Sequence, residues 1–216
     1  MAVPIQSRRA LLSLLALLAA LIAVPAFAQP IRIVALGDSL TAGYGLKPAE
    51  GFPAKLQAAL RARGHDVTVV DAGVSGDTTA DGLARLDWSV PADAAAVIVE
   101  LGANDALRGL DPKLGRANLD AILSHLSKRH LPILLAGMLA PPNLGRDYAA
   151  AFDPIYPALA LEHHAILYPF FLDGVAGHAD LVQPDGLHPT AAGVDVIVAR
   201  ILPSAEALLA RVAGGS

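Results

Sequence analysis

The sequence predicts an α/β sandwich with a parallel sheet of about five strands and helices on both of its faces. Two observations lead to this fold. Short apolar segments alternate with longer segments of helical periodicity along most of the 216 residues, and this alternation is typical of parallel strands joined by right-handed helical crossovers. The apolar segments are also continuous in Val, Ile, Leu and Ala, which indicates strands that are covered on both faces.

The first 28 residues are not expected to belong to this fold. Arg8 and Arg9 precede the apolar run ALLSLLALLAALIAV, which is followed by Pro25 and by Ala26-Phe27-Ala28. A short basic start, an apolar run and a small-x-small ending are the pattern of a secretory leader that is cut after Ala28. The alternative is an uncleaved membrane anchor, but the run is near the lower length limit for a bilayer span. We therefore expect a cleaved signal peptide, by general secretory or twin-arginine export, and a periplasmic or secreted protein without a stable membrane anchor.

Five strands and five helices are expected in the rest of the chain. The strands are IRIVALG (31–37), DVTVVDAG (66–73), AAVIVELG (95–102), PILLAGM (132–138) and AILYPF (165–170). The helices cover residues 49–63, 79–86, 112–129, 148–164 and 189–212. The third helix has the clearest start, because Asp111 can cap it and Pro112 suits its first position. There is no repeat or linker, so residues 29–216 are expected to form a single domain.

The composition excludes several classes of function. The chain has 16 basic and 20 acidic residues and no basic block, so nucleic acid is not an expected partner. It has no cysteine, which excludes disulfides, thiolate metal sites and a cysteine nucleophile. Neither glycine-rich motif for phosphate binding, G-x-G-x-x-G or G-x-x-x-x-G-K-[ST], is present.

Polar, glycine-containing loops follow the first three expected strands, and a fourth lies beyond the last. These segments are GDSLTAGYG, DAGVSGDTT, LGANDALRG and QPDGLHPTAAG. The carboxyl ends of parallel strands meet at one edge of the sheet, where such folds bind their ligands. The four loops are therefore expected to form one site.

A serine, a histidine and an aspartate in these loops suit nucleophilic catalysis. A serine hydroxyl is a poor nucleophile until a base removes its proton, and a third group must hold the tautomer of that base. Ser39 can be the nucleophile and His188 the base, since Pro189 restricts the backbone of His188 and suits the first position of the last helix. Gly186 allows the tight turn that brings Asp185 to the ring.

Two other interpretations of Asp185 and His188 stay open from the residues alone. They fit an ordinary helix-capping turn, and they fit a pair of metal ligands. The metal interpretation needs further ligands at a suitable spacing, and none is evident, so no metal or other cofactor is expected. Asp38, beside Ser39, is expected to bond backbone amides of its turn.

An acyl-transfer site also needs hydrogen-bond donors for the developing oxyanion. Asn104 offers a side-chain amide after the third strand, and Gly76 offers a backbone N–H that no Cβ obstructs. With the backbone N–H of Ser39, these groups can form a hole with three donors.

At this point the residues carry a resemblance to a known family. Gly37-Asp38-Ser39-Leu40, Gly76, Gly102-Ala103-Asn104-Asp105 and Asp185-Gly186-Leu187-His188 resemble, in this order, the four sequence blocks of the GDSL or SGNH hydrolases. The resemblance covers nearly the whole chain after the leader. It implies a flavodoxin-like three-layer α/β/α sandwich, Ser39 as nucleophile, His188 as base and Asp185 as the orienting carboxylate. It also implies that Ser39, Gly76 and Asn104 form the oxyanion hole.

Within the family the chain most resembles the bacterial periplasmic acyl-CoA thioesterase, arylesterase and lysophospholipase subgroup. The segments VSGDTTADGLARL, LGANDALRGL and AAFDPIYPALA are similar to segments of those enzymes. The loop LAPPNLGRDY resembles their substrate-covering loop, which implies substrate contacts from Leu139, Pro141, Pro142, Asn143 and Leu144.

The resemblance implies a monomeric serine hydrolase that acts on small-molecule or lipid acyl esters and thioesters. A carbohydrate O-deacetylase of the same superfamily is an alternative, although the chain has only one Trp and four Tyr for stacking on sugars. A non-catalytic flavodoxin-like binding module is a second alternative. Such a module has no need to hold Ser, Asn, Asp and His together.

Overall fold

All five expected strands are present in the computed structural model of the chain, which describes residues 30–214. They are β1 (Ile31–Gly37), β2 (Val67–Gly73), β3 (Ala96–Glu100), β4 (Ile133–Ala136) and β5 (Ile166–Tyr168). They form one sheet in the order β2-β1-β3-β4-β5, and every neighbouring pair is parallel. The chain therefore builds outward from β1 in one direction and then in the other, which opens a crevice at the carboxyl ends of β1 and β3.

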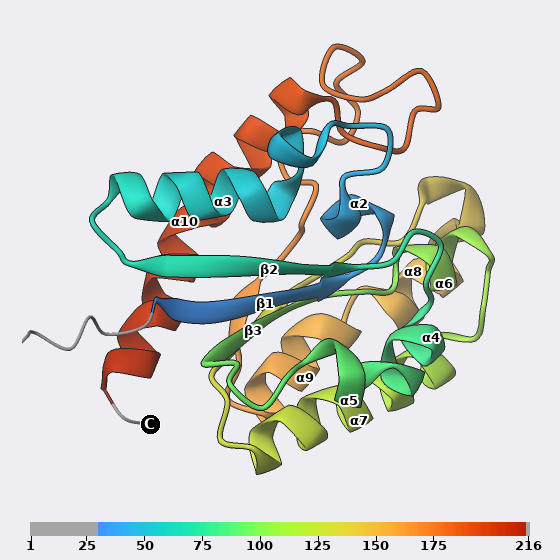
Figure 1. Cartoon of the computed structure of the whole chain (residues 1–216). Helices are drawn as coiled ribbons and strands as arrows, with labels where there is room; N and C mark the ends of the chain where they lie inside the picture. Colours follow the sequence, from blue (N-terminus) through green and yellow to red (C-terminus); the bar gives the residue numbers. More distant parts are fainter. Residues whose placement is uncertain (1–29, 215–216) are drawn as a thin grey trace, which may run out of the picture.

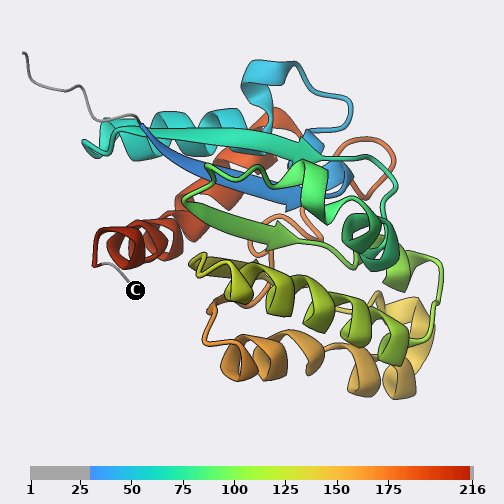
Figure 2. The ribbon, with the colours of Figure 1, turned by 60° about the horizontal axis from the view of Figure 1, so that its bottom comes forward.

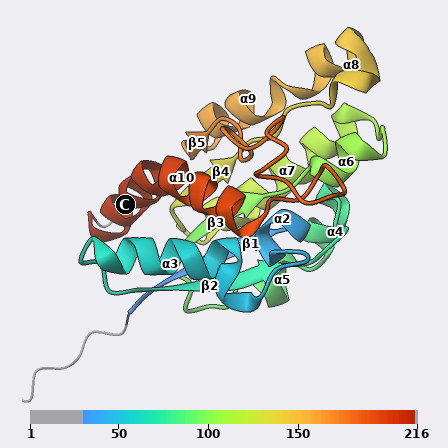
Figure 3. The same cartoon turned by 90° about the horizontal axis from the view of Figure 1, so that it is seen from above.

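Helices cover both faces of this sheet, so the predicted three-layer α/β/α sandwich is confirmed (Figure 1). α3 (Phe52–Ala62) and α10 (Ala191–Ala213) lie side by side over one face, as the view from above also shows (Figure 3). α7 (Pro112–Lys128) and α9 (Ile155–Glu162) cover the opposite face (Figure 2). The other helical elements are α2 (Ser39–Ala42), η1 (Pro48–Glu50), α4 (Thr79–Ala84), α5 (Leu86–Ser89), α6 (Ala103–Leu107), η2 (Pro142–Leu144) and α8 (Gly145–Phe152).

The single helix expected over residues 148–164 is two helices, α8 and α9. The break falls at Asp153 and Pro154, where the Asp153 carboxylate accepts the backbone N–H of Ala140 at 2.8 Å. A proline has no N–H to continue a helical ladder, so Pro154 starts a new helix instead of extending the first.

The last helix starts later than the sequence predicts. Thr190 is its N-cap, because the Thr190 side chain accepts the backbone N–H of Gly193 at 3.2 Å. Pro189 therefore lies outside the helix, where it forms an isolated antiparallel bridge with Val182. The prediction that Pro189 occupies the first helical position was wrong, and its place in the bridge instead fixes the segment that carries His188.

The central strands are fully covered, as their continuous apolar sequences predict. All five residues of β3 are buried, and so are the last five residues of β1. Glu100, the last residue of β3, is the only charged residue in the two buried runs and is 1% exposed. Its burial is unusual for a carboxyl group.

No helix within residues 30–214 is long and apolar enough to cross a membrane. The expected leader, residues 1–28, lies outside the residues that the structure describes.

Candidate active site

The four polar loops of the sequence meet at the carboxyl edge of the sheet, around a cavity of about 450 Å³. Its walls include Ser39, Gly76, Asn104 and His188, which follow β1, β2, β3 and β5 in the chain. Apolar side chains make up most of the remaining wall: Leu40, Tyr44, Ala103, Ala106, Leu107, Met138, Leu139, Pro141, Phe170, Leu172 and Leu187. The cavity therefore combines a few polar groups with a surface suited to an apolar ligand.

Ser39 is the first residue of α2, directly after β1 and Asp38. The Asp38 carboxylate caps this short helix, since its Oδ1 accepts the backbone N–H of Leu40 at 2.9 Å. The expectation that Asp38 bonds an amide of its own turn is thus confirmed. The cap holds the turn so that the Ser39 side chain, 9% exposed, reaches the cavity wall.

Ser39, His188 and Asp185 form a continuous line of hydrogen-bond contacts. His188 Nε2 lies 2.9 Å from Ser39 Oγ, and His188 Nδ1 lies 2.7 Å from Asp185 Oδ2. With neutral imidazole, this arrangement requires the proton on Nδ1 and leaves Nε2 free to accept the serine proton. The structure therefore brings together three side chains from two ends of the chain in the order that serine activation requires.

The turn of Asp185 also serves the backbone. Asp185 Oδ1 accepts the N–H groups of Leu187 and His188 at 2.9 and 3.0 Å, and Gly186 has a left-handed φ of 73°. These backbone bonds, together with the bond to the ring, lower the pKa of Asp185 to about 2. The carboxylate is accordingly charged at any pH near neutrality. Asp185 thus has the bonds of a capping turn and, in addition, a contact with the imidazole.

Tyr44 packs against the imidazole and Gln183 bonds the backbone on either side of it, and neither role was predicted from the sequence. The ring centroids of Tyr44 and His188 are 4.6 Å apart. Gln183 Nε2 donates to the carbonyl oxygens of Tyr44 and Pro189 at 2.7 and 2.9 Å. The backbone N–H of Gln183 donates to the carbonyl oxygen of His188 at 2.7 Å. Gln183 therefore ties the segment that follows Ser39 to the segment of His188.

The expected oxyanion donors line the same cavity as Ser39. Gly76 has a left-handed φ of 91°, and a Cβ at this position would point into open space beside the Arg108 guanidinium. Asn104 stands at the start of α6, but its Nδ2 already donates to Asp38 Oδ2 at 3.1 Å and to the Asp77 carbonyl at 3.0 Å. One of these two bonds must open before the amide can bind an oxyanion in the cavity.

The loop after β4 contributes fewer wall residues than expected. Leu139 and Pro141 line the cavity. Pro142, Asn143 and Leu144 do not, because the chain turns into η2 after Pro141 and carries them outward. The apolar wall instead draws on Leu107, Met138 and Phe170, which lie after β3, β4 and β5. Leu107 belongs to the loop LGANDALRG and Met138 directly precedes the loop LAPPNLGRDY, but no sequence pattern marked these side chains for a substrate role.

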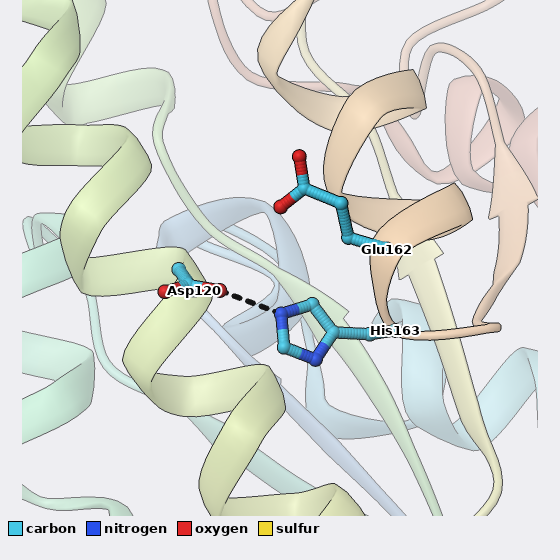
Figure 4. A group of neighbouring side chains, drawn as sticks. All are labelled: Asp120, Glu162 and His163. Carbon is cyan, nitrogen blue, oxygen red and sulfur yellow. Dashed lines mark hydrogen bonds and ion pairs between the residues drawn. The ribbon is translucent and has the colours of Figure 1, made fainter.

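One group of side chains in the described part of the chain has the spacing of metal ligands, and it lies outside this cavity. It consists of Asp120 on α7 with Glu162 and His163 at the end of α9, as Figure 4 shows. His163 Nε2 is 2.7 Å from Asp120, and both Glu162 oxygens accept from Arg116 at 2.6 and 2.8 Å. These bonds join α7 to α9 and explain the group without an ion.

Comparison with known proteins agrees with this geometry. Residues 35–196 match the family described as GDSL-like Lipase/Acylhydrolase. The chain is 39% identical over 202 residues to Esterase TesA of Pseudomonas aeruginosa, a match that covers 93% of this chain and 100% of that protein. It is 39% identical over 158 residues to Thioesterase 1/protease 1/lysophospholipase L1 of Escherichia coli K12, which covers 73% of this chain and 74% of that protein.

A solved structure extends the likeness to three dimensions. The crystal structure of AlinE4, described as an SGNH-hydrolase family esterase, is 49% identical in sequence. It superposes with a TM-score of 0.72 over 85% of this chain and 99% of that chain.

Proposed function

Since the chain belongs to the GDSL-like lipase/acylhydrolase family and is a carboxylic ester hydrolase, we propose that it cleaves esters and thioesters through an acyl-enzyme on Ser39. The observation that carries the proposal is the line of contacts from Ser39 Oγ through the His188 ring to Asp185, at 2.9 and 2.7 Å. In this mechanism His188 takes the serine proton as Oγ attacks the acyl carbon. Asp185 stabilises the imidazolium that results.

The leaving alcohol or thiol then receives the proton from His188, and the acyl group stays on Ser39. A water molecule, activated by the same imidazole, releases the acid and restores the serine. The oxyanion that forms in both steps binds to the backbone N–H groups of Ser39 and Gly76 and to the Asn104 side chain. The position of these donors on one cavity wall with Ser39 supports this assignment.

The chemistry of the cavity favours an apolar acyl group. Its wall holds Leu107, Met138, Leu139 and Phe170, and none of the described residues that line it is Asp, Glu, Lys or Arg. Burial of an alkyl chain stabilises a complex by about 0.8 kcal/mol per CH₂ group. We therefore propose that small-molecule or lipid acyl esters and thioesters are the substrates.

Two measurements test the proposal. A fluorophosphonate probe should label the protein once per chain and abolish hydrolysis in proportion to labelling. A series of p-nitrophenyl and acyl-CoA substrates of increasing acyl length should then show kcat/KM rising with length until the cavity is filled. A protein that takes up no probe and hydrolyses none of these substrates would contradict the proposal.

We also propose that the protein is exported and that its mature form is a monomeric single domain starting at Gln29. The basic start, apolar run and Ala-x-Ala ending of residues 1–28 support export. The presence of every proposed site residue in one chain supports the monomer. Intact mass of the exported protein and light scattering of the purified protein test the two points; retention of the apolar run, or a dimer, would contradict them.

A further inference from the structure

Glu100 is a buried carboxyl group that the proposed mechanism does not use. It ends β3, pairs in register with Gly37 of β1 and Ala136 of β4, and is 1% exposed. Its Oε2 accepts the hydroxyl of Thr41 at 2.7 Å, whereas its Oε1 is buried without a hydrogen-bond partner. A buried carboxylate oxygen without a donor is strongly unfavourable, and the same oxygen in a neutral carboxyl group is much less so.

Thr41 connects Glu100 to the turn that carries Ser39. Both Thr41 and Ser39 belong to α2, and Thr41 is completely buried. Asp38, on the other side of Ser39, is also completely buried and bonds Leu40 and Asn104. The short helix that begins at Ser39 is thus attached to two buried carboxyl groups, one directly before it and one through a hydroxyl.

No cation within residues 30–214 forms an ion pair with either carboxyl group. Arg85 is buried nearby, but its guanidinium donates to Asp77, to Ser89 and to the carbonyl oxygen of Gly37. His188 lowers the pKa of Asp38 and Asp77 raises it, so the two effects oppose each other. The Tyr156 hydroxyl, which lies near both groups, donates to the Leu101 carbonyl.

Two buried carboxyl groups without a cation do not both ionise, because each charge opposes the other. Their partners decide where the remaining proton lies. Asp38 has two N–H donors for its carboxylate, and Glu100 has an oxygen with none. The pKa values agree with this assignment. Burial raises the pKa of Asp38 to about 6. Burial and the negative charge of Asp38 raise the pKa of Glu100 well above its ordinary value, although hydrogen bonds from Thr41 and from the backbone N–H of Asp38 act in the opposite direction.

We propose that Glu100 is a positioning residue that stays protonated at neutral pH and fixes the turn of Ser39 through Thr41, while the one negative charge of the pair resides on Asp38 and holds Asn104. The role in positioning rests on the proposed function, in which Ser39 is the nucleophile. The protonation of Glu100 does not depend on it. The two carboxyl groups therefore hold the turn of Ser39 in place without adding a second negative charge next to the nucleophile.

Infrared spectroscopy of the purified protein tests the protonation directly. At pH 8 the exposed carboxyl groups and Asp38 are ionised, and the other buried carboxyl group of the described residues, Asp105, accepts the backbone N–H and the hydroxyl of Thr79. The carbonyl stretch of a protonated carboxyl group is therefore expected from Glu100. Glu100→Gln should remove this band. The matched control is Glu162→Gln, which changes an exposed glutamate paired with Arg116 and should leave the band in place.

Absence of the band from the wild-type protein at pH 8, or its persistence in Glu100→Gln, would overturn the proposal. The wild-type spectrum decides the question even if the variant does not fold. The spectrum also decides whether Glu100 is protonated if the wild-type protein hydrolyses no ester. In that case only the proposed function has failed.

Kinetics test the positioning role. Glu100→Gln removes no charge, so kcat should stay within about threefold of the wild type and the acid limb of the kcat/KM profile should keep its midpoint. Thr41→Val breaks the contact and should lower kcat at least about tenfold with little change in KM, whereas Thr41→Ser should restore it. A shift of the acid limb by more than about half a pH unit in Glu100→Gln would mean that Glu100 is charged, and full activity of Thr41→Val would mean that the contact does not position Ser39.

Discussion

Asn104 donates its side-chain amide to the carboxylate of Asp38, 3.1 Å away, so the residue directly before Ser39 holds a residue that the sequence places 66 positions later. The same nitrogen donates to the Asp77 carbonyl. An amide nitrogen has two hydrogens, and both are engaged. An oxyanion at Ser39 must therefore compete with Asp38 or Asp77, and the bond to Asp38 ties the two sides of the crevice between β1 and β3.

Replacement of Asn104 tests whether this amide binds the oxyanion. Asn104→Ala should lower kcat by roughly 10²–10³-fold, about 2.7–4 kcal/mol, because the interaction is made mainly in the transition state. KM should change much less. Steady-state kinetics on a p-nitrophenyl ester measure both quantities, and the fluorophosphonate probe should still label the variant, only more slowly.

Asn104→Asp is the sharper variant of the pair. It sets a second carboxylate against Asp38 and a negative charge against the oxyanion, so it should be at least as damaging as the alanine variant. If Asn104→Ala kept more than about a third of the wild-type kcat, the amide would serve only to hold Asp38 and Asp77, and the hole would consist of the two backbone donors.

Ser39→Ala should remove both ester hydrolysis and fluorophosphonate labelling, because Ser39 is the nucleophile in the proposed mechanism. The folded circular dichroism spectrum should not change, because among the described residues the Oγ of Ser39 bonds only His188. Ser124→Ala on α7 is the matched control and should keep both activities. Ser75 also lines the cavity. If the probe labelled Ser75 in the Ser39→Ala protein, the assignment of Ser39 as the nucleophile would be wrong.

Much of the fold could be read from the sequence, because buried parallel strands have continuous apolar sequences and each of the five expected strands is found. The loops of Ser39 and His188 could be placed once the strands were known, because these loops follow the ends of strands. Helix boundaries were less predictable. The break before α9 falls at Pro154, a local signal that the expected single helix over residues 148–164 did not use, whereas the bond between Asp153 and the backbone of Ala140 is a contact between loops that no local pattern reveals.

The interactions around the proposed catalytic set were the least predictable part of the site. The contact between the Tyr44 and His188 rings joins residues 144 positions apart in the chain and depends on the way in which the two loops fold over each other. Glu100 lies within the strand expected over residues 95–102, and its position there indicates no partner for its carboxyl group. Only the register of β1 with β3 shows that its carboxyl group lies under Thr41.

Asp185→Asn should lower kcat on the order of 10⁴-fold, as expected when a base loses the carboxylate that holds its tautomer. The acid limb of the kcat/KM profile should also move to lower pH, because a neutral amide no longer favours the imidazolium. The pKa of Asp185 is about 2, so loss of its own charge does not produce the acid limb of the wild type. Asp180→Asn, an exposed change in the same segment, should leave the profile intact; an equal effect of both variants would contradict the assignment of Asp185.

Asp38→Asn tests whether the buried negative charge of Asp38 destabilises the fold. The folded-state pKa of Asp38 is about 6 against an ordinary 3.8, so the folded protein binds this proton more tightly than the unfolded chain. Asp38 therefore costs the fold nothing below about pH 4 and destabilises it increasingly up to about pH 6, by a total of about 3 kcal/mol.

Asparagine does not titrate, so the free energy of unfolding of Asp38→Asn relative to the wild type should rise by up to about 3 kcal/mol between pH 4 and pH 7.5. Any constant loss from the altered contact with Asn104 cancels in this comparison. Urea unfolding at the two pH values measures the difference, with the exposed Asp147→Asn as the control that should show no such rise. A relative stability that is the same at both pH values would mean that Asp38 ionises as an ordinary carboxyl group, and that burial beside Glu100 does not raise its pKa.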